Sequence, residues 1–431
     1  MLRSPGTLRI EPARRFRGRF RLPGDKSISH RAALLGAMAT GRTRIENYSE
    51  AADCASTLGC LSALGVPVHR QGARVEIEGP GVEGWRAPAG VLDAENSGST
   101  LRMLAGALAG RPFRSVLTGD ASLRRRPVER VAVPLRAMGA RVATTEGRPP
   151  LTIEGGSLRG IAYELPVASA QVKTAVLLAG LQAGGETSVR EPSPSRDHTE
   201  RMLPAFGADV RREGLRATVR GGTALHGTDL RVPGDASSAA FLVVAALVLP
   251  DAGVELEDVL LSPTRTAFLD VLRAMGGRVE ARLLATDPEP VGTIVASSSE
   301  LRGTRVDPAL VASLIDEVPA LAAAAAHAEG RFTVTGAREL RVKESDRIAA
   351  LVEGLSALGA DVQELPDGLV VEGGPRLHGA PLHAHGDHRI AMALAVAALG
   401  ADGPSELDDA ACVAVSFPGF FDLAARASGR A

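Results

Sequence analysis

The chain is short of cysteine, aromatic side chains and net charge, and each shortage argues against a class of protein. Its three cysteines, Cys54, Cys60 and Cys412, show no Cys-x-x-Cys spacing, which argues against a disulfide framework or a structural zinc site. Aromatic residues make up 3% of the 431 residues, and 49 basic side chains stand against 50 acidic ones. Neither base stacking nor bulk positive charge therefore favours nucleic-acid binding, and no nucleic-acid partner is expected.

Long apolar segments are also missing. The longest apolar run, residues 239–249, is shorter than a membrane-spanning helix. The first 25 residues hold seven arginines and lack the apolar core of a signal peptide. We therefore expect no membrane partner and a cytoplasmic location. With 45% apolar and 23% charged residues, the chain has a globular composition and is long enough for two large domains.

Lysine is the scarcest of the charged residues. It accounts for three of the 49 basic residues, Lys26, Lys173 and Lys343, and the other 46 are arginine. A lysine ammonium is compact and has a tunable pKa, whereas a guanidinium is a fixed planar fork. In a chain so rich in arginine, we expect each retained lysine to mark a functional position. The alternative is that some of these lysines lie on a solvated face and have no functional role.

A short motif of leucine, glycine and valine recurs along the chain and predicts repeated α/β units. Each copy reads as the last turn of an amphipathic helix, a glycine that ends it, and then a strand. Six units of about 72 residues would fill the chain. The glycines lie 68 to 83 residues apart, and the last belongs to a weaker copy: Gly65, Gly139, Gly207, Gly276, Gly359 and Gly429.

A longer repeat divides the chain into halves. Residues 21–27 (RLPGDKS) resemble residues 231–237 (RVPGDAS), and each segment leads from a strand into a helix capped by aspartate. We predict one domain of three units over residues 24–233, and a second formed by residues 1–23 plus 234–431. The chain would cross between them near Pro23 and Pro233, which suits hinge closure of a cleft on a ligand.

Polar clusters are predicted at the starts of several helices. Helix N-termini attract anions through unpaired N–H groups and the helix dipole, and added Lys or Arg creates phosphate and carboxylate sites. Any single cluster could instead hold only helix caps. The clusters span residues 25–31, 96–100, 169–173, 196–201, 343–347 and 387–389.

Several familiar catalytic motifs are absent from the sequence. It contains no Walker-type phosphate loop, no GxSxG and no HExxH. His383, His385, Asp387 and His388 could ligate a metal, but Asp387 reads equally well as a helix cap, and no metal is expected. Asp316 and Glu317 are candidate acid–base carboxylates or ordinary charges at a helix start. The residues alone predict a two-domain α/β enzyme that grips a multiply anionic substrate, and they leave the reaction open.

Taken together, the motifs resemble the second class of the 5-enolpyruvylshikimate-3-phosphate synthase (EPSP synthase) family. One match is weak, but an ordered set that covers nearly the whole chain is specific. The resemblance implies a two-domain inside-out α/β barrel of six βαβαββ repeats, three per domain, with the active-site cleft between the domains. The motifs are PGDKSISHR from Pro23, NSGST from Asn96, GDASLRRRPVER from Gly119, SAQVK from Ser169, RDHTE from Arg196, PTRT from Pro263, IDEVP from Ile315, RVKESDR from Arg341, GDHRIAM from Gly386 and SFPGF from Ser416.

The resemblance also implies a reaction. The family transfers the enolpyruvyl group of phosphoenolpyruvate to the 5-hydroxyl of shikimate 3-phosphate and releases phosphate, through a tetrahedral intermediate and without a metal or organic cofactor. This step of the shikimate pathway leads to chorismate and the aromatic amino acids. A monomer is implied. Glyphosate-insensitive members of this class carry alanine where this chain has Gly98, so glyphosate is expected to inhibit this chain.

Two alternatives remain at this stage. A UDP-N-acetylglucosamine enolpyruvyl transferase would share the fold, but that family has Asn after the lysine and a reactive cysteine on a central loop. This chain has Ser27 and Arg31, which suit a small carboxylate, and no cysteine in residues 119–126. A repeat-built binding module or RNA-end-processing protein is the other alternative, and the near-neutral charge disfavours it.

Site residues are implied by the same resemblance. Lys26, Asp316 and Glu344 would be catalytic, with Asp316 as the base and Glu344 as the acid, and the assignment of each proton to each carboxylate stays open. The residues implied for shikimate 3-phosphate are Lys26, Ser27, Arg31, Ser169, Ala170, Gln171, Arg196, Asp316 and Lys343. Those implied for phosphoenolpyruvate are Lys26, Asn96, Gly98, Arg126, Gln171, Arg347 and Arg389.

Overall fold

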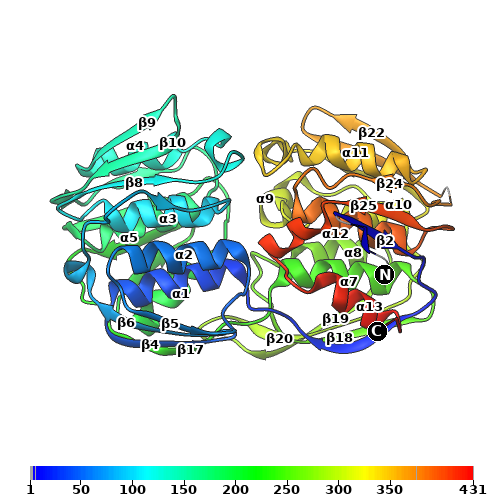
Figure 1. Ribbon diagram of the computed structural model, residues 1–431, viewed down its shortest axis with the longest axis horizontal. Helices are drawn as coiled ribbons and strands as arrows, with labels where there is room; N and C mark the ends of the chain where they lie inside the picture. Colours follow the sequence, from blue (N-terminus) through cyan, green and yellow to red (C-terminus); the bar gives the residue numbers. More distant parts are fainter. Residues whose placement is uncertain (1–2, 5, 375, 431) are drawn as a thin grey trace. The chain divides into compact units, whose positions relative to one another are not determined.

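The computed structural model describes residues 3–4, 6–374 and 376–430, and the chain divides into two compact units (Figure 1). The first unit is Gly24–Val232, and the second combines Met1–Pro23 with Pro233–Ala431. The chain therefore passes between the units twice, once after Pro23 and once after Val232. The hinge predicted near these two crossings stays a prediction.

The first unit alternates helices with short strands. Its helices are α1 (Lys26–Met38), α2 (Ala52–Ala63), α3 (Gly98–Leu108), α4 (Glu129–Met138), α5 (Ala170–Gly180) and α6 (His198–Met202). Its strands are β4 (Thr40–Glu46), β5 (Val68–Gln71), β6 (Arg74–Pro80), β7 (Leu92–Asp93), β8 (Arg114–Thr118), β9 (Arg141–Thr145), β10 (Arg148–Glu154), β11 (Leu158–Arg159), β12 (Ala162–Glu164), β13 (Ala183–Gly184), β14 (Glu186–Arg190), β15 (Val210–Glu213), β16 (Arg216–Arg220) and β17 (Asp229–Arg231).

The second unit has the same kind of alternation. Its helices are α7 (Ala236–Val248), α8 (Ala267–Ala274), α9 (Val311–Leu314), α10 (Val318–Ala326), α11 (Arg347–Ala357), α12 (His388–Leu399) and α13 (Phe420–Ala427). Its strands are β1 (Arg3–Ser4), β2 (Thr7–Ile10), β3 (Phe16–Arg21), β18 (Ala252–Leu260), β19 (Arg278–Ala285), β20 (Val291–Ser297), β21 (Gly330–Val334), β22 (Asp361–Leu365), β23 (Gly368–Gly373), β24 (Pro381–Leu382) and β25 (Ser405–Asp408).

One sheet plan recurs through both units. The first unit has the strand orders β17-β4-β6-β5, β7-β8-β10-β9 and β12-β14-β16-β15, and the second has β3-β18-β20-β19 and β24-β25-β2-β1. In each of these sheets the first two strands are parallel and the remaining pairs are antiparallel. In the sheet β21-β23-β22, parallel bridges from Arg302 to Glu329 and from Arg305 to Thr333 stand where a fourth strand would lie.

The start of the chain completes a sheet that the end of the chain builds. Strand β2 pairs antiparallel with β25, from Thr7 opposite Asp408 to Ile10 opposite Ser405. Strand β3 then runs parallel to β18, as β17 runs parallel to β4 in the first unit. Each unit is therefore closed by a strand that comes from a distant part of the chain.

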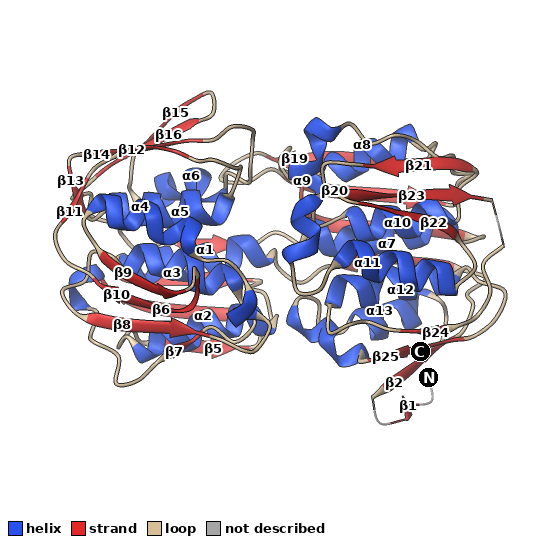
Figure 2. Ribbon diagram, turned by 90° about the horizontal axis from the view of Figure 1, so that it is seen from above, coloured by secondary structure: helices blue, strands red, loops and turns tan. Residues whose placement is uncertain are grey.

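Helices lie inside each unit and sheets lie outside. The helices α1, α3 and α5 of the first unit and α7, α10 and α12 of the second are buried along nearly their whole lengths. Figure 2 shows strands on either side of α3 and α5 in the first unit. A helix that is apolar on all sides must be buried on all sides, and the Ala-, Val- and Leu-rich α7 and α10 meet that condition. The predicted inside-out α/β barrel is confirmed.

Backbone angles confirm the predicted helix ends. All six repeat glycines have positive φ, from 71° at Gly429 to 114° at Gly139. Strands β5, β9, β15, β19 and β22 begin two or three residues after their glycines. One copy differs in detail, because Gly207 ends a 3-10 turn, Leu203–Phe206, that follows the short α6. Glycine reaches this left-handed conformation without a Cβ penalty, which explains why the motif repeats.

One stretch of the described residues combines apolar composition with the length of a membrane span. No single helix in the described ranges is long and apolar enough to cross a membrane, whereas Pro308–Leu314 and Val318–Ala326 pass that test together as a pair bent by 113°. The second member of the pair is α10, whose residues are all buried in the second unit.

Gly106 sets the closest approach between α3 and α5. A Cβ added there would lie 2.0 Å from the backbone oxygen of Ala175. We expect Gly106→Ala to lower the free energy of unfolding by about 2–3 kcal/mol, because the helices must separate and lose core contacts. Urea denaturation measures the effect. Gly59→Ala on α2 is the matched control, since no atom lies within 4 Å of its added Cβ. Equal stability of the two variants would contradict the prediction.

Candidate active site

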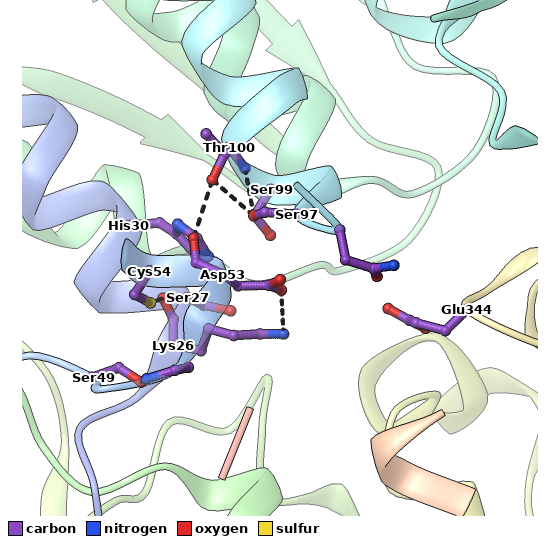
Figure 3. A network of polar contacts seen from close by, with 12 residues as sticks. Lys26, Ser27, His30, Ser49, Asp53, Cys54, Ser97, Ser99, Thr100 and Glu344 are labelled. Carbon is purple, nitrogen blue, oxygen red and sulfur yellow. Dashed lines mark hydrogen bonds and ion pairs between the residues drawn. The ribbon is translucent and has the colours of Figure 1, made fainter. Parts of the chain in front are cut away.

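The start of α1 holds the first predicted site residue. Lys26 is the first residue of α1, and Asp25 caps the helix by accepting a hydrogen bond from the Ile28 N–H. The Lys26 ammonium lies 2.8 Å from Oδ2 of Asp53 on α2, as Figure 3 shows. The two side chains are 16% and 7% exposed, so this is a largely buried ion pair. The pairing holds the ammonium at the helix start.

Two arginines contact the first turn of α1, Arg31 from the same helix and Arg196 from a distant segment. Arg196 donates from Nη1 to Oγ of Ser27 at 3.1 Å. The buried Arg31 donates to the Ser27 carbonyl at 2.8 Å, to Oγ1 of Thr199 at 2.8 Å and to Oγ1 of Thr174 at 2.9 Å. The structure therefore brings Ser27, Arg31 and Arg196 together, as the sequence predicted for one substrate.

The start of α5 is joined to α3. Ser169 caps α5, and Ala170 is its first residue. The Gln171 side chain accepts a hydrogen bond from Nη1 of Arg102 at 2.8 Å and donates one to Oγ of Ser99 at 2.9 Å. Two predicted helix-start clusters thus lie side by side, linked through Gln171.

The segment before α3 forms a further contact set. Oδ1 of Asn96 accepts a hydrogen bond from Nη2 of Arg126 at 2.6 Å, and Nδ2 of Asn96 donates to Asp120 at 2.7 Å. Gly98 is the first residue of α3, and Ser97 is its cap. The predicted residues Asn96, Gly98 and Arg126 therefore lie together.

A buried chain of polar side chains, most of them hydroxyl groups, connects α1, α2 and α3. Nδ1 of His30 lies 2.7 Å from Oγ1 of Thr57, which lies 2.6 Å from Oγ1 of Thr100, and Thr100 lies 2.7 Å from Oγ of Ser97. Burial, aided by the nearby Lys26 ammonium, lowers the pKa of His30 well below its usual value. The imidazole is therefore neutral at neutral pH, and the chain ties α1 to α2 and α3 without adding charge.

In the second unit, one arginine gathers three carboxylates. Arg347, the first residue of α11, lies 3.3 Å from Asp316 Oδ1, 2.6 Å from Glu344 Oε2 and 2.8 Å from Asp387 Oδ2. Its side chain is 1% exposed. Burial alone would lower the pKa of Arg347, but Asp387, Glu344 and Asp316 together raise it above its usual value. The guanidinium therefore stays charged and orients the carboxylates.

Asp316 has cations around it as well. Its Oδ1 lies 3.4 Å from Nζ of Lys343 and 3.9 Å from Nε of Arg389, in addition to its contact with Arg347. Arg389 also donates from Nη1 to the Asp316 carbonyl at 2.9 Å. The second unit thus brings together every residue that the sequence predicted on it: Asp316, Lys343, Glu344, Arg347 and Arg389.

The histidine run does not converge on one point. Nδ1 of His383 lies 2.6 Å from Asp408, a contact that raises the pKa of His383, and Nε2 of His385 lies 3.1 Å from Glu353. Asp387 belongs to the arginine cluster instead. Over the ranges that the structure describes, no group of three or more His, Cys, Asp or Glu side chains is placed to hold a metal ion.

Three partners of the predicted residues were missed by sequence reasoning. No spacing distinguishes Asp53 from other surface or cap residues, and Asp120, although it lies within the motif that begins at Gly119, was given no role. Arg102 carried a usable signal, because it stands four positions after Gly98 at a helix start, the spacing that also relates Ser27 and Arg31.

The fold of this chain is the enolpyruvyl transferase fold, and its family and curated relatives make it a transferase. The enolpyruvyl transferase NikO from Streptomyces tendae shares that fold, with a TM-score of 0.80 over 98% of each chain and 21% identity. The chain belongs to the EPSP synthase (3-phosphoshikimate 1-carboxyvinyltransferase) family, whose model matches residues 10–423. The predicted family, fold and enzyme class are confirmed.

Individual relatives agree with the family match. The chain is 52% identical over 418 residues to 3-phosphoshikimate 1-carboxyvinyltransferase of Desulforudis audaxviator (strain MP104C), covering 96% of this chain and 97% of that one. It is 52% identical over 420 residues to the protein of the same name from Acidithiobacillus ferrooxidans (strain ATCC 53993 / BNL-5-31), covering 97% of each. A solved structure of EPSP synthase from Acinetobacter baumannii has a TM-score of 0.87 and 45% identity over 98% of each chain. These relatives do not favour the UDP-N-acetylglucosamine alternative.

Proposed function

We propose that this chain transfers the enolpyruvyl group of phosphoenolpyruvate to the 5-hydroxyl of shikimate 3-phosphate and releases phosphate. The observation that carries the proposal is the grouping of cations at helix starts, at the positions of the family's motifs. Lys26 and Arg347 are the first residues of α1 and α11, and Arg196 lies just before the cap of α6. Arg126 and Lys343 each follow a 3-10 turn and contact Asn96, beside the start of α3, and Asp316. Two substrates that together carry two carboxylates and two phosphates require such groups.

Shikimate 3-phosphate presents a carboxylate and a phosphate, and different groups are proposed for each. Ser27 and Arg31 would hold the carboxylate. Ser169, the Ala170 N–H and Arg196 would hold the phosphate, because a helix start attracts anions through its unpaired N–H groups and a guanidinium adds positive charge. Lys343 and Asp316 would contact the ring hydroxyls. The 3.1 Å bond from Arg196 to Ser27 supports this set, since it places the two anion-binding groups next to each other.

Phosphoenolpyruvate would be held by a second group of residues, with Lys26 and Gln171 shared between the two substrates. Arg126, anchored by Asn96, would face it in the first unit, beside Gly98. Arg347 and Arg389 would supply the cations of the second unit. Three arginines suit a trianionic ligand, because each guanidinium can bind a carboxylate or phosphate through two parallel hydrogen bonds.

The reaction requires one proton donor and one proton acceptor. The proposed pair is Glu344 and Asp316, and both regain their initial protonation states by the end of the reaction. In the addition step, protonated Glu344 gives a proton to the methylene carbon of phosphoenolpyruvate while Asp316 takes the proton of the attacking 5-hydroxyl. In the elimination step, Glu344 takes a proton from the new methyl group, and Asp316 returns its proton to the departing phosphate. Arg347 contacts both carboxylates and holds them at a fixed spacing.

Phosphate release tests the proposal directly. The enzyme is mixed with phosphoenolpyruvate and either shikimate 3-phosphate, unphosphorylated shikimate or UDP-N-acetylglucosamine. We expect rapid release with shikimate 3-phosphate, far slower release with shikimate and none with the nucleotide sugar. Phosphate release with the nucleotide sugar would overturn the proposal. A folded sample that releases phosphate with none of the acceptors would also overturn it. We further propose a cytoplasmic monomer that uses no metal or organic cofactor, as the family resemblance implies.

Glyphosate is expected to compete with phosphoenolpyruvate, and Gly98→Ala is expected to weaken that inhibition about tenfold or more. A Cβ at position 98 would lie 2.6 Å from Nη1 of Arg102, so this guanidinium must move. Arg102 also holds Gln171, and we therefore expect a smaller rise in KM for phosphoenolpyruvate. Inhibition constants measured at several phosphoenolpyruvate concentrations give the result. Gly59→Ala is the control, and an unchanged inhibition constant for Gly98→Ala would contradict the prediction.

A further inference from the structure

Lys173 is the one lysine of this arginine-rich chain that the proposed reaction does not use. It lies on α5, one turn after the Ser169 cap, and is 2% exposed. Lysine is almost never buried to this extent unless it is paired. Its role must therefore be sought in its partners.

Two buried carboxylates meet the Lys173 ammonium. Nζ lies 2.6 Å from Oε2 of Glu191 and 2.7 Å from Oε1 of Glu200, and the three side chains are at most 5% exposed. Glu191 also accepts a hydrogen bond from Oγ of Ser195. The lysine thus connects two acidic residues nine positions apart in the sequence.

These carboxylates mark the two ends of one segment, residues 191–200. Glu191 directly follows β14, and Glu200 lies on α6. Between them the chain forms neither helix nor strand until His198, so the regular hydrogen bonds of secondary structure do not set its path. The contacts with Lys173 tie both ends of the segment to α5.

Segment 191–200 carries groups proposed to bind shikimate 3-phosphate or to support its binding. Arg196 donates to Ser27, and Thr199 accepts from Arg31. Thr199 also lies 2.6 Å from Oγ1 of Thr174, the residue after Lys173 on α5. A shift of the segment would therefore displace Arg196 and the support of Arg31 together.

We propose that Lys173 is a positioning residue for the phosphate of shikimate 3-phosphate. Through Glu191 and Glu200 it holds both ends of segment 191–200, so that Arg196 is placed beside Ser27 before the substrate arrives. Without the ammonium, two buried carboxylates would repel each other and move apart. A compact ammonium fits between single oxygens of two partners, where a planar guanidinium does not, which explains the lysine.

A double-mutant cycle tests this role, which rests on the proposed function. Lys173→Met is expected to raise KM for shikimate 3-phosphate about 10- to 100-fold, the effect of losing a charge-assisted hydrogen bond, while KM for phosphoenolpyruvate changes less than about threefold. In an Arg196→Ala background, Lys173→Met should raise KM no more than about threefold further, because the group it positions is already absent. Full additivity of the two changes would overturn the proposal.

Further variants keep the test decisive if Lys173→Met does not fold. Glu191→Gln and Glu200→Gln each remove one charge, and each should raise KM for shikimate 3-phosphate without a matching fall in kcat. Lys173→Arg should fail to restore the wild-type KM. Arg111→Met is the matched control, because Arg111 is also buried in the first unit and bonds Gln182 and Val82, away from the site. Equal KM changes in Arg111→Met and the Glu variants would overturn the proposal. A wild-type enzyme without activity on shikimate 3-phosphate would instead overturn the proposed function.

Discussion

Lys26→Met is expected to lower kcat by about 10³-fold or more, because it removes a cation proposed to face the charge that develops in the transition state. The ammonium lies at the start of α1, where the helix dipole adds to its field. KM should change much less than kcat, since the other cations proposed to bind the two substrates remain. Initial rates of phosphate release over a range of both substrates separate the two effects.

A paired variant separates catalysis from stability. Lys26→Met leaves the Asp53 carboxylate, 7% exposed, without its ion pair, so the single variant is also expected to be less stable. Adding Asp53→Asn removes that unpaired charge. We expect the double variant to regain thermal stability and to remain inactive. Recovery of more than a tenth of the wild-type kcat in either variant would show that the lysine is structural.

Asp316→Asn is expected to lower kcat by about 10²- to 10⁴-fold, because an amide cannot accept the proton of the attacking hydroxyl. The variant keeps the size of the side chain and leaves Arg347 its contacts with Glu344 and Asp387. Steady-state phosphate release gives kcat, and circular dichroism shows whether the fold is kept.

Asp346→Asn serves as the matched control for that loss. Asp346 directly precedes Arg347 in the sequence and caps α11. It pairs with Arg341 and lies outside the cluster of cations around Asp316. We expect its kcat to stay within about threefold of wild type, with at most a small loss of stability from the lost ion pair with Arg341, because Asn caps a helix about as well as Asp. A comparable fall of kcat in both variants, or a wild-type kcat for Asp316→Asn, would remove Asp316 from the role of base. Glu344→Gln would then be the next variant.

Features that depend on neighbouring residues were predictable from the sequence. The repeat glycines end helices because only glycine reaches positive φ without penalty, and this requirement acts within a few residues. The aspartate caps at Asp25 and Asp235 are equally local. The scarcity of lysine likewise pointed to Lys26 and Lys343, both of which lie in the proposed site.

Partners from distant segments were not predictable. The pairing of Lys26 with Asp53, and of Gln171 with Arg102, depends on how helices pack, and no sequence spacing records it. Lys173 shows the same limit: its rarity marked it, but its link to Glu191 and Glu200 became visible only in the folded unit. Burial decides these contacts, because a charge removed from water must find a partner wherever the fold provides one.

The sequence by itself determined the repeated units, their helix ends, the polar clusters at helix starts and, through its ordered motifs, the family. Those features follow from local backbone preferences and from interactions between residues that are close in the sequence. Tertiary structure alone decided that β2 completes a sheet with β25, that one arginine holds Asp316, Glu344 and Asp387 together, and that segment 191–200 is anchored by Lys173. Contacts between residues far apart in sequence arise from packing of the whole unit, so a local sequence pattern does not predict them.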